Sequence, residues 1–135
     1  MIEIKNISKK FGKLEVLKNV SVSCNSGQCI ALIGPNGCGK TTLIKSILGM
    51  VIPDAGSMKF NEKSIFGDYL YREKIGYMPQ IGRYPDTMTI GEIIEMVKKI
   101  RNSKDNLDED LFRDFEIEKM LNKQMRTLSG GTTQK

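Results

Sequence analysis

The first two dozen residues alternate between apolar and polar side chains. In MIEIKNI, Ile2 and Ile4 fall on one face and Glu3 and Lys5 on the other. The stretch NVSVSC (residues 19–24) repeats this alternation, with its valines and its cysteine inward. Because successive side chains of a strand point to opposite faces, both stretches are predicted to be strands with one buried face.

Three later stretches also indicate strands. CIALI (29–33) is apolar throughout, which is typical of a strand covered on both faces, usually in a parallel sheet. PDAGSMKF (53–60) predicts a turn into another short strand. KIGYMPQ (74–80) predicts one more, ending at Pro79.

Helical periodicity begins after a glycine-rich stretch and returns later. TTLIKSILG (41–49) carries an apolar stripe, and Gly49 is the expected C-cap. TIGEIIEMVKKI (89–100) opens with Thr89 and Glu92 at capping-box spacing. NLDEDLFRDF (106–115) has leucines and a phenylalanine four apart and predicts another helix.

These elements divide the chain into a strand-rich part and a helical part. Residues 1–80 are expected to be strand-rich with one helix, and residues 81–126 are expected to be helical. A length of 135 residues, with 39% hydrophobic and 27% charged, is ordinary for a folded protein. No apolar signal core and no run of 18 apolar residues occurs, so we expect a chain that is neither exported nor membrane-spanning.

Charge and chemistry narrow the functional classes. The net charge of +5 comes from scattered lysines, which fits solvated lysines, an anionic ligand or a membrane surface better than a nucleic-acid face. The three cysteines form no CxxC pair, which disfavours a disulfide framework or a zinc site. The chain has no histidine, so histidine acid–base catalysis within these residues is excluded.

The glycine-rich stretch matches G-x-x-x-x-G-K-[ST], the phosphate-binding loop of nucleotide-binding proteins. Glycines let backbone N–H groups surround phosphate oxygens, the lysine reaches the β and γ phosphates, and the threonine hydroxyl can bind Mg²⁺. The stretch lies between an apolar run and an amphipathic helix, as this chemistry requires. The predicted phosphate-binding residues are Gly34, Pro35, Asn36, Gly37, Cys38, Gly39, Lys40, Thr41 and Thr42.

Two residues of this region have alternative interpretations. Phe11 could stack on an adenine, or it could be a core or hairpin residue. Cys38 could be a thiol whose oxidation blocks the site, or simply a variable position of the loop.

Together these motifs resemble the nucleotide-binding domain of ABC transporters, a P-loop NTPase. The resemblance implies an α/β fold, with a nucleotide-binding core that includes an antiparallel β part and a partial parallel sheet over residues 1–80, and a helical subdomain over residues 81–135 that ends in the signature motif. GPNGCGKTT is similar to the Walker A loop of that family, YMPQ to its Q-loop, and LSGGTTQK to its signature motif. The resemblance implies ATP and Mg²⁺ as ligands, with Lys40 and Gln80 catalytic, Thr41 and Gln80 at the metal, and Phe11 on the adenine. The family usually has glutamine where this chain has Thr132. The motifs are also similar to ATPases of exporters associated with copper-enzyme maturation.

The resemblance also implies partners and a location. Two such domains pair head to tail, so Ser129, Gly130 and Gly131 would bind the ATP held by a second domain. Residues 83–99 would touch transmembrane permease subunits, which would hold the protein at the cytoplasmic face of the membrane. No nucleic-acid partner is implied.

The family's Walker B strand, catalytic glutamate and switch histidine follow the signature motif, and they are absent from these 135 residues. We therefore expect the chain to be the N-terminal part of a longer domain and unable to hydrolyse ATP alone. Two other hypotheses remain open. One is a soluble ABC-type ATPase acting on ribosomes or DNA, and the other is a remnant that binds nucleotide without hydrolysis.

Overall fold

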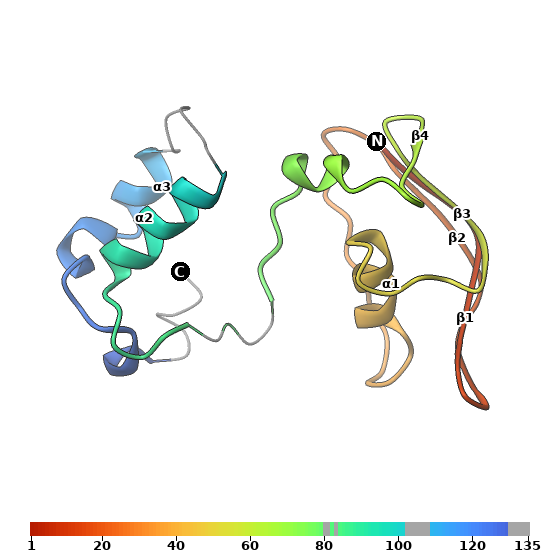
Figure 1. Cartoon of the computed structure of the whole chain (residues 1–135), viewed down its shortest axis with the longest axis horizontal. Coiled ribbons are helices and arrows are strands. Elements are labelled where there is room, and N and C mark those ends of the chain that lie inside the picture. Colours follow the sequence, from red (N-terminus) through yellow and green to blue (C-terminus); the bar gives the residue numbers. More distant parts are fainter. Residues whose placement is uncertain (80–81, 83, 102–108, 130–135) are drawn as a thin grey trace. The chain divides into compact units, whose positions relative to one another are not determined.

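The computed structural model describes residues 1–79, 82, 84–101 and 109–129. The chain divides into two compact units, Met1–Gly76 and Tyr77–Lys135. Figure 1 shows the strands in the first unit and most of the helical residues in the second. Each unit is described by itself below.

The first unit contains a four-stranded antiparallel sheet. Its strands are β1 (Ile2–Phe11), β2 (Leu14–Cys24), β3 (Ala55–Phe60) and β4 (Lys63–Ser64), in the order β2-β1-β3-β4. Ile4 lies opposite Val22 on one side and Met58 on the other, so apolar side chains of three strands share one face. The two predicted alternating strands and the strand after PDAG are confirmed.

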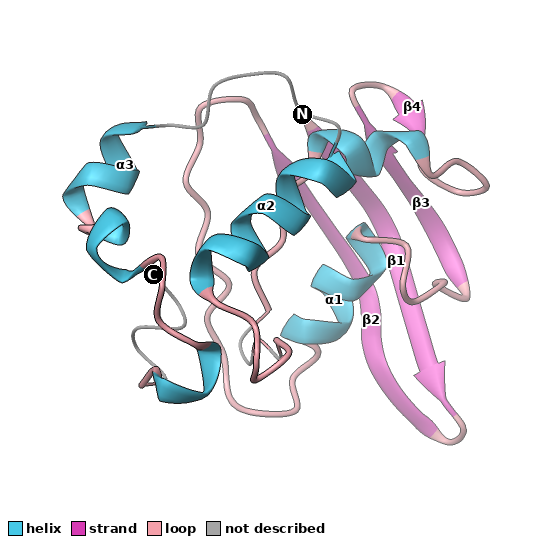
Figure 2. Cartoon of the chain, turned by 60° about the vertical axis from the view of Figure 1, so that its left-hand side comes forward, coloured by secondary structure: helices cyan, strands magenta, loops and turns pink. Residues whose placement is uncertain are grey.

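The helix α1 (Lys40–Ile47) lies along the apolar face of this sheet (Figure 2). Burial of that face removes apolar surface from water and supplies most of the stabilisation of the unit. The hydroxyl of Ser46, itself buried, donates to the carbonyl of Thr42 at 2.9 Å. The buried cluster comprises Ile4, Ile7, Leu17, Leu43, Met58, Ile65 and Tyr71.

The C-terminal end of α1 is closed by the 3₁₀ helix η1 (Leu70–Lys74). The Tyr71 hydroxyl donates to the carbonyl of Ile47 at 2.8 Å, and the Arg72 guanidinium donates to the carbonyl of Gly49 at 3.3 Å. These bonds satisfy carbonyls that have no partner within a helix. Gly49 follows the C-cap with φ of 66°, so the predicted helix end is confirmed within one residue.

Two predicted strands are wrong. Residues 29–33 have irregular backbone, and their large apolar side chains are exposed, with Ile33 at 93%. Residues 75–79 are irregular as well. A β-strand requires a neighbour to accept and donate its ladder hydrogen bonds, and among the described residues neither stretch belongs to the sheet or to an isolated bridge. The sheet of the described residues is therefore antiparallel, without the expected parallel strand at 29–33.

The second unit is helical in its described residues. It contains α2 (Ile90–Arg101), α3 (Glu109–Asp114) and the 3₁₀ turns η2 (Ile117–Met120) and η3 (Met125–Thr127). Both predicted helices of this part are confirmed, although residues 106–108 of the second lie outside the described residues. None of the described helices combines the length and the apolar character needed to cross a bilayer.

The start of α2 is fixed by a capping box, as predicted. The backbone N–H of Thr89 donates to the Glu92 carboxylate at 2.7 Å, and the N–H of Glu92 donates to the Thr89 hydroxyl at 3.2 Å. Next to it, the N–H groups of Ile90 and Gly91 donate to the carbonyls of Lys123 and Leu121. The chain after η2 thus returns alongside the start of α2.

Candidate nucleotide-binding site

The glycine loop (residues 34–39) leads directly into α1, and its end sets the geometry of the helix start. Gly39 is the N-cap, with φ of 95°, and no side chain caps the helix. The first N–H groups of an α-helix have no partner within the helix, and the helix dipole makes this end positive. A serine or aspartate N-cap would occupy one of these donors, whereas glycine leaves them available to an anion.

Two glycines of the loop allow close approaches that another residue would prevent. A Cβ on Gly39 would lie 2.7 Å from the carbonyl oxygen of Val16 in β2, and one on Gly34 would lie 2.8 Å from the Cys38 sulfur. Gly39 is buried while residues 34–38 are exposed. The loop is therefore anchored against the sheet at one end, and the rest of it faces solvent.

Lys40 is folded back across the loop. Its Nζ donates to the carbonyl oxygens of Gly34 and Pro35, both at 2.7 Å, and lies 3.7 Å from the Cys38 sulfur. The lysine is half-buried at the first position of α1. An ammonium has three donors, so the two carbonyl bonds hold a positive charge beside the positive end of the helix.

The two threonines differ in their surroundings. Thr41 is exposed in the first turn of α1, where its hydroxyl could reach a cation. Thr42 is half-buried, and its carbonyl accepts the Ser46 hydroxyl. Gln80, the other predicted metal-binding residue, lies outside the described residues.

The residues present therefore fit a nucleotide phosphate with its Mg²⁺. The loop offers exposed glycine-rich backbone anchored on β2 at Gly39, an ammonium held by loop carbonyls, and helix N–H groups that no side chain caps. Asn36 and Gly37 form the exposed turn between these anchors, and Gly37 has φ of 82°. The cluster can thus bind a polyphosphate through backbone dipoles and one side-chain charge.

Phe11 ends β1, just before the turn that joins β1 to β2. Its side chain is 50% exposed, and the Lys9 ammonium lies 5.5 Å from its ring centroid. Figures 1 and 2 show this turn and the glycine loop at the same end of the first unit. Phe11 is thus a hairpin residue that also leaves ring surface open to a ligand.

The predicted residues of the signature motif fall in the second unit. Ser129 is exposed and lies on irregular backbone after η3. Gly130 and Gly131, like Thr132, lie outside the described residues.

Sequence reasoning missed the surroundings of Phe11. Lys9 and Phe11 are two apart in a strand, so they share a face, and this spacing could have indicated their contact. Asp54, which pairs with Lys9, is 45 residues away in the sequence and gave no signal.

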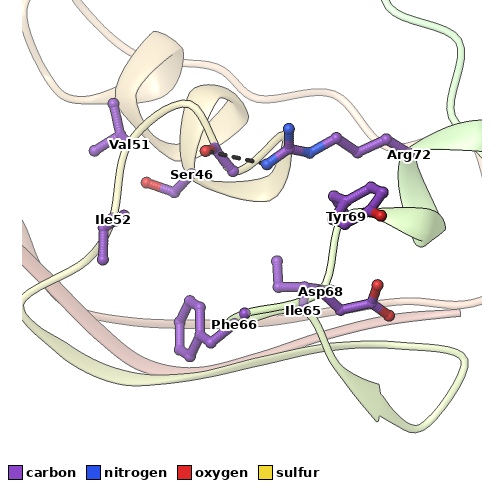
Figure 3. A pocket seen from close by; sticks show the side chains of 10 residues that line it. Ser46, Val51, Ile52, Ile65, Phe66, Asp68, Tyr69 and Arg72 are labelled. Atoms are coloured by element: carbon purple, nitrogen blue, oxygen red, sulfur yellow. Dashed lines mark hydrogen bonds between the residues drawn. The ribbon is translucent and has the colours of Figure 1, made fainter.

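A cavity of about 310 Å³ lies at the other end of α1, beside η1. Figure 3 shows Ile52 and Phe66 lining this cavity, and Arg72 extending along its rim to donate a hydrogen bond to the Gly49 carbonyl. Its lining includes no residue of the glycine loop. The cavity is therefore separate from the candidate phosphate site.

Comparisons with known proteins agree with this geometry. The sequence profile of the family described as ABC transporter matches residues 17–135. The sulfate/thiosulfate import ATP-binding protein CysA of Pectobacterium atrosepticum is 32% identical over 142 residues, which cover 99% of this chain and 43% of that protein. The chain thus spans less than half the length of the curated relatives it matches.

Solved structures give the same result. An ATP-binding subunit of an ABC transporter superposes with a TM-score of 0.84 at 27% identity, covering 98% of this chain and 57% of that one. A nucleotide-free ATP-binding cassette of an ABC transporter superposes with a TM-score of 0.77, also at 27% identity, covering 96% and 59%. The glycine loop, the fold and the family profile agree, and the chain belongs to the ATP-binding domains of the ABC transporter family.

Proposed function

We propose that this chain binds Mg-ATP through the glycine loop and α1 as part of the ATP-binding subunit of an ABC transporter. The observation that carries the proposal is the Lys40 ammonium, held by two loop carbonyls beside a helix start whose N-cap is glycine. This arrangement supports phosphate binding because both the charge and the N–H donors are in place before a ligand arrives.

The backbone of the loop and three side chains contact different parts of the nucleotide in this proposal. Backbone N–H groups of the loop and of the first turn of α1 hold the phosphates, and Lys40 neutralises charge on the β and γ phosphates. The Thr41 hydroxyl would hold Mg²⁺, and the bound ion would supply positive charge against the phosphate oxygens. The ring of Phe11 stacks on the adenine.

The remaining parts of the transport cycle depend on partners. We infer that Gln80 contacts the metal and the attacking water, and that Ser129, Gly130 and Gly131 bind ATP held by a second domain. ATP binding then closes a head-to-tail dimer, and hydrolysis reopens it and drives permease subunits at the cytoplasmic face of the membrane. The curated relative is named as an importer, which favours import over the copper-related export that the sequence suggested.

Calorimetric titration with Mg-ATP tests nucleotide binding. Lys40→Ala removes a charge-assisted contact, so we expect about 10- to 100-fold weaker binding. Lys45→Ala is the matched control, because Lys45 is an exposed lysine in the last turn of the same helix. Equal affinities of the unchanged chain and Lys40→Ala would contradict the proposal.

Phosphate release from Mg-ATP distinguishes the proposal from a chain that binds without hydrolysis. The expectation that these 135 residues alone do not hydrolyse ATP stays a prediction. Turnover by the purified chain that Lys40→Ala abolishes would contradict that expectation while supporting ATP as the substrate.

A further inference from the structure

The ring of Phe11 makes a cation–π contact with Lys9 on one of its faces. The Lys9 ammonium lies over the ring, 5.5 Å from its centroid, and the Lys9 side chain is only 17% exposed. Cations are attracted to the negative face of an aromatic ring, more strongly when they are partly desolvated. One face of Phe11 is thus engaged, while the ring as a whole remains half exposed.

Asp54, in the segment between α1 and β3, fixes this lysine. Its Oδ1 accepts from Lys9 Nζ at 2.7 Å, and its Oδ2 accepts from the backbone N–H of Lys10, also at 2.7 Å. The Asp54 N–H donates to the carbonyl of Ser8 at 2.9 Å. Three hydrogen bonds therefore fasten Asp54 to the end of β1 that carries Phe11.

We propose that Asp54 is a positioning residue for the nucleobase, because it holds Lys9 over one face of Phe11 and so presents the other face for stacking. The inference rests on the proposed function and adds to it a residue that touches neither phosphate nor base. The ammonium also draws electron density toward its own side of the ring, which favours stacking of an electron-rich purine on the opposite face.

The alternative to positioning is a purely structural role for the ion pair. Hydrogen bonds from Lys9 and from the Lys10 N–H lower the pKa of Asp54, so the carboxylate stays ionised at neutral pH. If the ion pair is purely structural, its loss should lower the amount of folded protein and so weaken the binding of every ligand of the site to the same extent. A positioning role acts only on ligands that contain a base.

The test compares two ligands of the whole chain, Mg-ATP and Mg-tripolyphosphate, which has no base. Asp54→Asn should weaken ATP binding about three- to tenfold, the range expected for loss of one cation–π arrangement, and leave tripolyphosphate binding unchanged. Lys9→Met keeps an apolar stem beside the ring without its charge and should give the same loss. It also decides the question if Asp54→Asn does not fold.

A control and a second background sharpen the test. Glu15→Gln removes a neighbouring ion pair with Lys10, 3.9 Å long, that does not involve Lys9 or Phe11, and should leave both affinities unchanged. With Phe11→Leu already in place, Asp54→Asn should cause no further loss of ATP affinity, because the ring it positions is gone.

The other outcomes distinguish failure of the positioning role from failure of the proposed function. The positioning role would be overturned if Asp54→Asn and Lys9→Met lowered the affinities for ATP and tripolyphosphate equally, or if they left ATP affinity unchanged. It would also be overturned if Asp54→Asn still lowered ATP affinity in the Phe11→Leu background. If the unchanged chain binds ATP no more tightly than tripolyphosphate, the inference fails while phosphate binding by the loop stands. If it binds neither ligand, the proposed function fails and takes the inference with it.

Discussion

The two units of this chain are stabilised in different ways. In the first unit eight apolar side chains are buried, whereas Ile93 is the one buried apolar side chain among the described residues of the second. In the second unit, α2 exposes Val97 and Ile100, and Leu111 of α3 is 54% exposed. The second unit relies more on its capping box and on backbone bonds to residues 121–126.

The two units also differ in net charge. Residues 1–76 contain eleven basic and six acidic side chains, and residues 77–135 contain ten of each, so the whole net charge of +5 lies in the first unit. This unit also contains the glycine loop. A positive unit attracts anions, and a buried core keeps the loop in place. The candidate phosphate site is therefore built on the better packed and more positive of the two units.

The largest expected effect concerns the two cores. Ile7 is fully buried, so Ile7→Ala should lower the free energy of unfolding by about 3 kcal/mol through lost burial and a cavity. Ile93→Ala in α2 should cost clearly less, and Ile100→Ala, at an exposed position, should change it by less than about 0.5 kcal/mol. Urea unfolding followed by circular dichroism measures all three. If Ile93→Ala lowered the free energy of unfolding as much as Ile7→Ala, the second unit would be as well packed as the first.

The second effect concerns the anchor of the glycine loop. Gly39→Ala adds a Cβ only 2.7 Å from a backbone oxygen at a positive φ, so it should destabilise the first unit by about 2–3 kcal/mol. Gly37→Ala is the matched control, because Gly37 has a similar φ but open space, and should cost about 1 kcal/mol. Thermal unfolding of both variants measures the difference. Equal costs would show that the contact with β2 contributes nothing.

The smallest effect is a pH dependence of α2. Hydrogen bonds from the Thr89 N–H and hydroxyl lower the pKa of Glu92, so the folded chain favours the ionised carboxylate. Such a group stabilises the fold above its unfolded pKa, and the stabilisation is lost as the pH falls through the folded pKa. We expect the helical signal of α2 to weaken as the pH falls below 4.5, the ordinary pKa of a glutamate.

Glu92→Gln isolates this contribution. Glutamine can still accept the Thr89 N–H but does not titrate, so the variant should have a flatter acid profile than the unchanged chain. Glu95→Gln, on the same helix but outside the capping box, is the control. Amide exchange of α2 at several pH values measures the effect, and identical profiles for all three proteins would exclude a contribution of Glu92 titration to the stability of α2.

Local patterns were sufficient for much of the chain. The alternation of Ile2 and Ile4 predicted β1, the spacing of Thr89 and Glu92 predicted the start of α2, and the glycine motif predicted a helix that begins at Lys40. Each of these features depends on residues a few positions apart. The stretches at 29–33 and 75–79 were predicted wrongly because an apolar composition does not itself provide a neighbouring strand.

The sequence by itself therefore determined the strands β1, β2 and β3, the helices α1, α2 and α3 and the residue types of the glycine loop, because these follow from local periodicity and backbone chemistry. Only the tertiary structure decided that Gly39 packs on β2, that Lys40 bonds two loop carbonyls, and that Asp54 reaches Lys9 across 45 residues. Such contacts are settled by the packing of α1 and β3 on the sheet, which brings distant residues together at distances that no local pattern encodes.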